Sequence, residues 1–255
     1  MVKTITMPQR EIGGVPTPGK LGEQLMRNAI LLGLPRREYK TVLAKLEFVA
    51  LPTGTVLHEM AGPIRFGYFI NAGLASILNI MSDGKCVEVG LSGKEGFVGL
   101  PLIVGFDSSP IHAVMQIGGS AYRLKAQDME RVLRQCPTLE KHLHRYAQEF
   151  ALQITQVAAC NRLHEVRRRL ARWLLMSEDR MGVSTFPLTQ QFIAHMLGTR
   201  RASVTVAAGA LQKARLIAYK RGTVNIMDRA GLEKAACDCY RQLGRQMELW
   251  SCNSH

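Results

Sequence analysis

The sequence lacks any apolar run near the roughly 20 residues that a helix needs to span a bilayer. Residues 1–20 also lack the hydrophobic core of a signal peptide, and Pro8, Pro16 and Pro18 interrupt them. We therefore expect a cytoplasmic protein with no membrane partner and a flexible tail over residues 1–20.

Cysteines are few and scattered, and no two of them have Cys-x-x-Cys spacing. Reduced thiols are the expected state in the cytoplasm. Cys237 and Cys239 could chelate a metal together with Cys252, but three ligands at this spacing are weak support for a site. We expect no metal and no cofactor. The six are Cys86, Cys136, Cys160, Cys237, Cys239 and Cys252.

Catalytic patterns are also missing. The chain has no Ser/His/Asp order, no paired carboxylates and no phosphate-gripping loop, since Gly93-x-x-Gly96 is too short to count as one. We expect that the protein is not an enzyme.

Acidic residues are scarce, because 33 Lys and Arg stand against 20 Asp and Glu, a net charge of +13. Residues 161–255 hold 16 of the basic and seven of the acidic groups. A concentrated positive field attracts polyanions such as nucleic acid or an anionic membrane face. Charge alone does not distinguish this from a solubilising surface.

Glycines and short apolar bursts fill the chain from Asn28 to Met129, which predicts short strands in an all-β sandwich or barrel. Asp83-Gly84 is the strongest hairpin signal, because glycine tolerates the backbone angles of the turn. A helix from Pro35 to about Phe48 is expected before the sheet. The bursts are Val56–Leu57, Tyr68–Ile70, Ser76–Ile80, Val87–Val89 and Val114–Ile117.

A long helix is expected after Pro137, because apolar residues recur with the spacing of a coiled-coil seam. A second apolar line runs through Ala147, Ala151, Ile154 and Ala158. One face can pack on the β-domain while the other meets a second copy; the alternative is a core helix in a monomer. We expect a dimer through Leu139, Leu143, Tyr146, Phe150, Ile154 and Val157.

The apolar phase slips near Asn161–His164, and a new helix is expected to follow. Its apolar line is Val166, Leu170, Trp173 and Leu174, and this line is flanked by Arg167, Arg168, Arg169 and Arg172.

Residues 187–198 predict a short helix with Thr189 as N-cap and Gly198 as its end. Thr199 is expected to cap a second helix from Arg200 to about Arg215. Two short helices joined by a tight turn that contains glycine form a helix-turn-helix, whose second helix enters the major groove. Its inward line is Val204, Ala207, Ala208 and Leu211.

The start of the second helix has the chemistry to bind DNA. Arg201 can bridge guanine O6 and N7. Arg200, Thr199 and Ser203 suit phosphate contacts at a helix N-terminus. The small residues Ala202 and Thr205 let the helix sit deep and can touch a thymine methyl.

Residues 216–227 then predict strand, basic turn and strand, the pattern of a wing. The alternative is a structural α+β cap with solvated arginines. The expected DNA-binding residues are Thr189, Gln190, Thr199, Arg200, Arg201, Ala202, Ser203, Thr205, Lys220 and Arg221.

Taken in order, the motifs from about Asn28 to Tyr240 resemble the Crp/Fnr family of bacterial transcription regulators. The motifs are Leu51-Pro52-x-Gly54-x-Val56-Leu57, Tyr68–Ile70 with Gly73, Asp83-Gly84, Gly93-x-Glu95-Gly96, the Pro137-led helix, and Leu188-Thr189 to Gly198 followed by the arginine-bearing helix.

The resemblance implies an α+β architecture: a cyclic-nucleotide-binding-like β-roll over residues 21–137, a dimerisation helix over 138–163 and a winged helix-turn-helix over 164–240. Residues 241–255 are expected to form a C-terminal tail. The implied partners are a second copy of the chain, a double-stranded DNA operator with two-fold symmetry, and RNA polymerase.

The chain departs from the family pattern in the second helix of the predicted helix-turn-helix. Ala202 stands where the family often has glutamate, and Val206 where another arginine often follows. The operator should therefore differ from that of the best-known members. Arg215 stands where the family commonly has Gly or Asn.

The ligand pocket departs further. Phe97 cannot accept a ribose hydroxyl as a carboxylate would, and Ile111 offers no charge to a cyclic phosphate. We expect no cyclic nucleotide, no iron–sulfur cluster because there is no N-terminal cysteine group, and no haem on a lone histidine such as His58. The pocket residues by resemblance are Gly96, Phe97, Val98, Gly99, Ile111, His112, Ala113 and Thr155.

The sequence thus predicts a DNA-binding, homodimeric transcription regulator whose β-roll senses an unidentified effector or serves only as a scaffold. The alternative is a small-molecule-sensing module whose DNA binding is vestigial. Four basic groups kept at Arg200, Arg201, Lys220 and Arg221 speak against that alternative.

Overall fold

The computed structural model describes residues 25–252, with side chains up to Arg245, so the expected tail over residues 1–20 lies outside it. The chain divides into two compact units. The first contains residues 25–84 and 91–147, and the second residues 85–90 and 148–252. Within residues 25–252, no helix is both long enough and apolar enough to cross a membrane.

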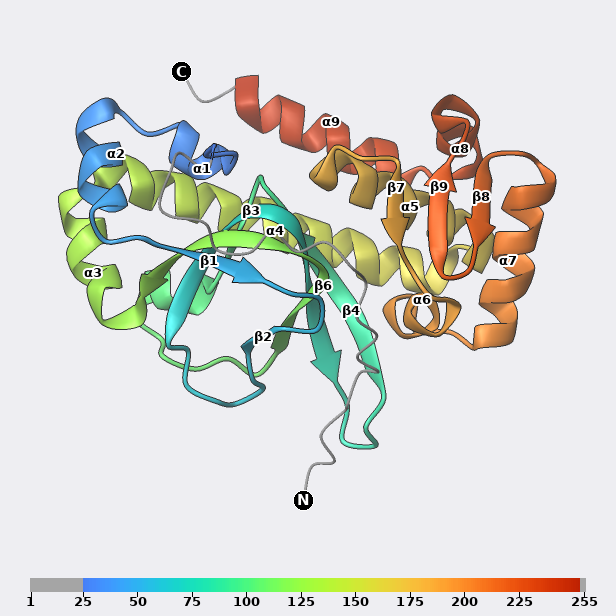
Figure 1. The fold of residues 1–255 in the computed structure, drawn as a ribbon, viewed down its shortest axis with the longest axis horizontal. Helices are drawn as coiled ribbons and strands as arrows, with labels where there is room; N and C mark the ends of the chain where they lie inside the picture. Colours follow the sequence, from blue (N-terminus) through green and yellow to red (C-terminus); the bar gives the residue numbers. More distant parts are fainter. Residues whose placement is uncertain (1–24, 253–255) are drawn as a thin grey trace. The chain divides into compact units, whose positions relative to one another are not determined.

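An antiparallel sheet forms the N-terminal unit, as the sequence predicts (Figure 1). Its strands follow the order β1-β6-β3-β4, with β2 also paired to β6 and β5 to β3. Their bounds are β1 Glu47–Leu51, β2 Val56–His58, β3 Phe66–Ile80, β4 Cys86–Ser92, β5 Phe97–Val98 and β6 His112–Lys125.

Strand β3 merges two of the expected strands, Tyr68–Ile70 and Ser76–Ile80, into one. Its pairing with β6 shifts register between Ile70 and Ala75, around Gly73. Gly73 has a φ of +84°, and a Cβ there would lie 2.5 Å from the carbonyl oxygen of Ile117. Glycine is required at this irregularity because it tolerates both the left-handed backbone and the close approach.

Asp83-Gly84 lies in the connection between β3 and β4, where the hairpin signal placed it. Gly84 has a φ of +80°, and its N–H donates to the carbonyl of Met81 over 2.9 Å. The connection is a longer loop than a two-residue turn.

Helices precede and follow these strands in the sequence. Helices α1 Ala29–Leu32 and α2 Arg36–Leu43 come before β1, a 3-10 helix at Leu100–Val104 lies between β5 and β6, and α3 Ala126–Gln135 follows β6. The expected helix from Pro35 to Phe48 is too long. Glu47 and Phe48 instead begin β1, where Arg123 lies 2.9 Å from the Glu47 carboxylate and the ring of Tyr122 lies 5.2 Å from that of Phe48. Cross-strand pairing on β6 overrides the local helical pattern.

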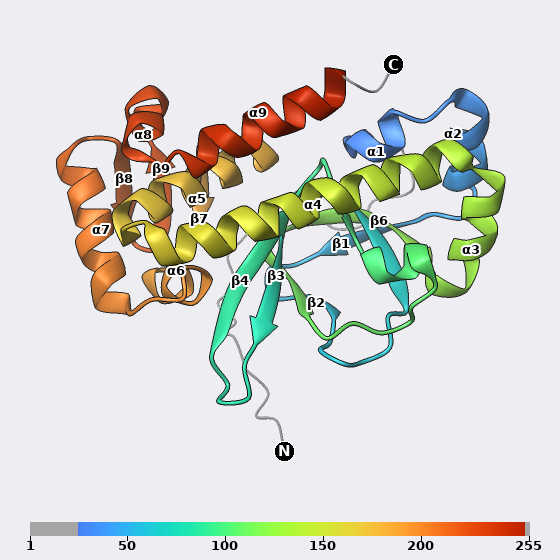
Figure 2. The same ribbon diagram turned by 180° about the vertical axis from the view of Figure 1, so that it is seen from behind.

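Helix α4, Pro137–Leu163, is one uninterrupted helix (Figure 2). The predicted dimer seam is wrong, because its residues lie on the buried face of α4. All of its members except Ile154 are buried within the single chain, at 8% exposure or less, so they cannot meet a second copy. The buried ones are Leu139, Leu143, Tyr146, Phe150 and Val157.

The C-terminal unit has a three-stranded sheet in the order β7-β9-β8 among short helices (Figure 1). Residues after Tyr240, expected to be a tail, continue as helix α9. The bounds are α5 Val166–Met181, β7 Thr185–Pro187, α6 Gln190–Met196, α7 Arg201–Lys213, β8 Ile217–Lys220, β9 Thr223–Ile226, α8 Arg229–Ala235 and α9 Cys239–Cys252.

Helix α5 is the centre of this unit and packs against α7, α8 and α9. Of the four arginines that flank its apolar line in the sequence, Arg167 and Arg168 are exposed, whereas Arg169 and Arg172 are buried. These two residues are 6% and 2% exposed, because helices cover α5 on more than one side.

Candidate nucleic-acid interface

Helix α6 begins as the sequence predicts. The Thr189 side chain accepts a hydrogen bond from the N–H of Phe192 over 3.2 Å, an N-cap that fixes where the helix starts. The helix ends at Met196, and Gly198 follows with a φ of +54°. Glycine adopts this conformation without strain, so the chain turns sharply here.

Helix α7 begins one residue later than expected. Arg200 is the N-cap residue, with extended backbone angles, and it makes no capping hydrogen bond through its side chain. Thr199 therefore does not cap the helix; its N–H donates to the carbonyl of Ala194 over 2.9 Å and closes the turn. Because the Arg200 side chain does not cap the helix, the first backbone N–H groups of α7 are available to donate hydrogen bonds to a phosphate.

The two faces of α7 differ sharply. The inward face matches the predicted line, with Val204, Ala207, Ala208 and Leu211 buried. The outward face is small or basic, and Val206 on it is 75% exposed. This exposed face consists of Arg201, Ala202, Thr205, Val206 and Gly209.

A hydrogen bond joins the two helices on the outward side. The hydroxyl of Thr205 lies 2.8 Å from Gln190 Oε1 and 3.1 Å from the carbonyl oxygen of Arg201. The hydroxyl has one proton, so it donates to one of these acceptors at a time. The contact brings two of the predicted DNA-binding residues, Gln190 and Thr205, side by side.

Buried Arg169 donates a hydrogen bond to the turn between α6 and α7. Its Nη2 donates to the carbonyl of Leu197 at the end of α6, and to Asn161 Oδ1 over 2.9 Å. Burial lowers the pKa of this guanidinium, but an arginine side chain stays charged at neutral pH in proteins. Sequence reasoning missed this positioning role, since nothing local distinguishes Arg169 from the surface arginines beside it.

The wing is a tight hairpin attached to the start of α6. Arg221 and Gly222 connect β8 to β9 with φ values of +50° and +77°, as a type I′ turn requires. The Tyr219 hydroxyl donates to the Leu188 carbonyl over 2.7 Å, and the Leu188 N–H donates to the Gly222 carbonyl over 2.7 Å. Burial raises the pKa of Tyr219, which keeps the phenol protonated as a donor.

Four basic side chains are exposed on this surface: Arg200, Arg201, Lys220 and Arg221. None of them forms an ion pair with an acidic group among the described side chains. Their charge is therefore free to attract an anionic partner.

The expected effector pocket is partly filled by its own residues. Phe97, on β5, is 2% exposed, and its ring lies 4.7 Å from that of Phe69. A Cβ on Gly67 would lie 2.3 Å from the Phe97 ring, and one on Gly96 would lie 2.3 Å from the Tyr146 hydroxyl. Phe97 and the Gly96 backbone thus belong to the core, as do Val98 and, nearby, Gly99.

On β6, Ala113 is buried and His112 is half-buried, as is Ile111 just before the strand. His112 Nδ1 lies 3.4 Å from the Glu59 carboxylate. Burial lowers the pKa of His112, and Glu59 partly opposes the change, so no fixed positive charge awaits a phosphate. Thr155 lies in the other unit, where its hydroxyl donates to the Ala151 carbonyl over 2.9 Å.

Residues 168–235 match the family model of the Crp-like helix-turn-helix domain. No curated protein sequence matches the chain. Among solved structures, FixK2 from Bradyrhizobium japonicum is similar with a TM-score of 0.65 and 15% identity, covering 75% of this chain and 98% of that one.

Two other solved regulators have the same fold. The c-di-GMP-responsive global regulator CLP from Xanthomonas campestris gives a TM-score of 0.63 at 17% identity, over 75% of this chain and 99% of that one. A CRP-family transcriptional regulator from Thermus thermophilus gives 0.60 at 19% identity, over 74% and 96%. The chain therefore has the fold of the Crp/Fnr family of transcription regulators and carries a Crp-like helix-turn-helix domain at residues 168–235.

Proposed function

We propose that the chain is a homodimeric transcription regulator that binds double-stranded DNA with two-fold symmetry. The observation that carries the proposal is that the outward face of α7 exposes Arg201 and the wing exposes Lys220 and Arg221, none with an acidic partner among the described side chains. Placed in the major groove, this face meets base edges while the wing meets the adjacent backbone.

Arg201 is the base reader, since a guanidinium on the first turn can bridge guanine O6 and N7. Ala202 and Thr205 reach thymine methyl groups, and exposed Val206 extends this apolar contact one turn further. Phosphate contacts come from the residues around the two helix starts and from the wing: Thr189, Gln190, Thr199, Arg200, Ser203, Lys220 and Arg221.

Dimerisation uses the exposed face of α4. Gln148, Ala151, Thr155, Ala158 and Arg162 are exposed at spacings of three, four, three and four, which is a coiled-coil seam parallel to the buried one. Its centre is small, so two helices can approach closely. Two reading helices related by the dimer axis would contact half-sites about 34–36 Å apart.

The β-roll acts as a scaffold or senses an effector other than a cyclic nucleotide. Phe97 fills space in the core, and Ile111 supplies no charge for a cyclic phosphate. Once bound to its operator, the dimer would contact RNA polymerase to change transcription.

Selection of genomic fragments by the full-length protein tests this function. We expect enrichment of a palindromic motif, unchanged by added cyclic AMP, and loss of that motif with Arg201→Ala. Arg134→Ala is the matched control, because this arginine is exposed on α3 and paired with Glu130. Failure to enrich any motif, with and without cell extract, would contradict the proposal.

A further inference from the structure

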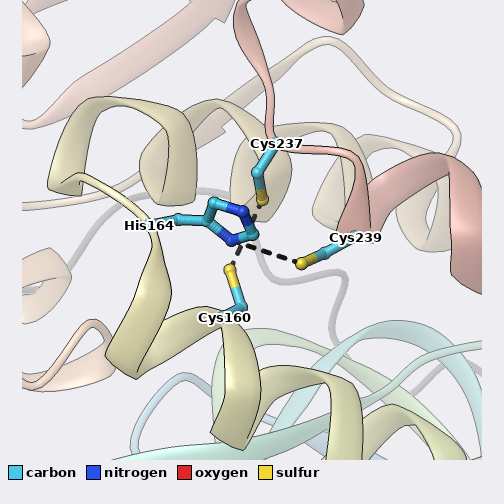
Figure 3. Close-up of side chains that lie close together, drawn as sticks. All are labelled: Cys160, His164, Cys237 and Cys239. Atoms are coloured by element: carbon cyan, nitrogen blue, oxygen red, sulfur yellow. Dashed lines mark hydrogen bonds between the residues drawn. The ribbon is translucent and has the colours of Figure 1, made fainter.

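Four side chains from two distant parts of the sequence converge in the C-terminal unit (Figure 3). Cys160 lies on the last turns of α4, and His164 follows the end of that helix. Cys237 and Cys239 lie at the junction of α8 and α9. Their sulfur atoms and the histidine nitrogen all lie within 4.8 Å of one another, and the three thiols are buried.

We propose that Cys160, His164, Cys237 and Cys239 form a zinc site. Zinc in a structural site takes four ligands in a tetrahedron, with Zn–S near 2.3 Å and Zn–N near 2.0–2.1 Å, which places neighbouring ligand atoms about 3.5–3.8 Å apart. Cys160 Sγ lies 3.4 Å from Cys237 Sγ, and Cys239 Sγ lies 3.5 Å from His164 Nδ1. The four atoms need only small side-chain rotations to surround one ion.

The spacing of the ligands along the chain suits this site. Cys160 and His164 are four residues apart, and the His164 N–H donates to the Cys160 carbonyl over 3.1 Å, so the last helical turn keeps both on one face. Cys237 and Cys239 flank one residue at the entry of α9. One mononuclear ion fits better than an iron–sulfur cluster, whose ligands bind separate irons and lie further apart.

A buried positive charge beside the thiols supports the proposal independently. Arg172 is 2% exposed, and within residues 25–245 it pairs with no carboxylate; its one hydrogen bond goes to the Met176 sulfur over 3.5 Å. Burying an unpaired guanidinium is costly. The positive charge of Arg172 acts on both Cys160 and Cys237, so it lies close to the cluster.

Zinc binding would supply the missing counter-charge. Three thiols lose their protons to solvent, and the resulting three thiolates, one Zn²⁺ and one neutral imidazole have a net charge of −1. The complex would thus neutralise Arg172 in the interior. Arg169 also interacts electrostatically with Cys160 and Cys237, and it donates a hydrogen bond to the Leu197 carbonyl in the helix-turn-helix.

The site therefore differs from the one considered on sequence alone. Cys252 is not needed, and its side chain lies outside the described part of the chain. Cys160 and His164 take its place. Zinc would join the end of α4 to the start of α9, so its role is structural and does not depend on the proposed DNA binding.

The test is the metal content of the full-length protein purified under reducing conditions. Mass spectrometry of the metal should find about one zinc per chain, as expected for a single four-ligand site. Cobalt substitution should give the visible d–d bands of a tetrahedral ion and a thiolate-to-cobalt charge-transfer band. Cys237→Ser and His164→Ala should each lose or weaken zinc binding at least about tenfold.

Cys86→Ser and Cys136→Ser are the matched controls, because these cysteines lie outside the cluster, and both variants should keep the metal. Fully reduced protein that takes up neither zinc nor cobalt would overturn the proposal. So would iron with acid-labile sulfide at these residues, or a metal-free Cys160–Cys237 disulfide as the state of the folded protein purified with added zinc.

Discussion

The indole of Trp173 donates a hydrogen bond to the Glu88 carboxylate over 2.7 Å, and both side chains are buried. Trp173 lies on α5, and Glu88 lies in β4, within the six residues of the sheet region that group with the C-terminal unit. These residues are 85 positions apart in the sequence. The contact joins β4 to α5, the helix against which α7 of the helix-turn-helix packs.

Removing this donor should destabilise the C-terminal unit. Trp173→Phe keeps much of the ring but leaves a buried carboxylate without its indole partner, which should lower the free energy of unfolding by about 1.5–3 kcal/mol. Urea denaturation followed by circular dichroism measures the loss. Phe186→Leu is the control for lost ring volume, because Phe186 is also buried in this unit. An equal loss in both variants would show that the hydrogen bond is not the cause.

Arg201→Ala should abolish discrimination at one base pair in each half-site, because it removes a bidentate contact with guanine. The cost at that pair should be about 1–3 kcal/mol, with little effect of base changes elsewhere. Titrations with operators mutated one position at a time provide the measurement. Equal weakening on every sequence would show that Arg201 does not read a base.

Lys220→Ala should instead weaken binding to all sequences alike. Lys220 lies at the wing and is expected to contact phosphate, so its loss should reduce the slope of log K against log salt by about 1. Affinities measured over a range of salt concentrations test this. A change in sequence preference with an unchanged salt slope would contradict the assignment.

Ala151→Glu should convert the dimer to a monomer. Ala151 is exposed at the centre of the proposed α4 seam, and two buried carboxylates facing each other across a two-fold axis repel. Light scattering after size-exclusion chromatography reports the mass. Ala44→Glu, at an exposed position on the N-terminal unit, should leave the dimer intact; a dimer that survives Ala151→Glu would place the interface elsewhere.

Arg215→Gly should stabilise the protein. Arg215 has a φ of +58°, and α7 ends in a Schellman motif in which its N–H donates to Gln212 and the Leu216 N–H donates to Leu211. A left-handed non-glycine residue costs about 1–2 kcal/mol, partly offset by the extra freedom of glycine when unfolded, so we expect a net gain of about 0.5–1 kcal/mol. Nothing in the structure explains the arginine.

The control for that variant is Ala214→Gly. Ala214 has a φ of −77°, where glycine gains nothing and adds only flexibility. It should therefore destabilise in the same chemical denaturation experiment. Destabilisation by Arg215→Gly would mean that the arginine side chain makes a compensating contribution.

Stability should fall as the pH drops below about 6.5, the ordinary pKa of histidine. Burial lowers the pKa of His58, and the hydrogen bond to the Phe66 carbonyl over 3.1 Å only partly opposes this. The unfolded chain then takes up a proton that the folded chain refuses, so the stability present above this pH is lost as the pH falls towards the folded pKa.

His58→Gln should remove part of this dependence, because glutamine keeps an N–H donor for Phe66 but does not titrate. Melting temperatures of both proteins, measured from about pH 7.5 down to about pH 5.5 around the ordinary histidine value, provide the test. His112 shows a pKa lowered by burial too, so some dependence should remain. Identical pH profiles would show that His58 does not contribute.

Local sequence by itself determined much of the helix-turn-helix and the wing. The Thr189 cap, the left-handed Gly198 and the Arg221-Gly222 turn depend on the conformational preferences of single residues, and each lies where the sequence predicts it. The inward face of α7 follows from its 3.6-residue period. The order of the elements identified the fold, because that order reflects which short segments can bury an apolar face.

Only the tertiary structure decided which surfaces are covered. Periodicity marks Leu139, Leu143 and Val157 as a buried seam, but it does not say whether the chain itself or a second copy buries them. Arg169 and Arg172 look like surface residues until helices close over α5. The meeting of Cys160 and His164 with Cys237 and Cys239 depends on the path of the chain through more than 70 intervening residues. Such long-range contacts arise from packing, which no local pattern encodes.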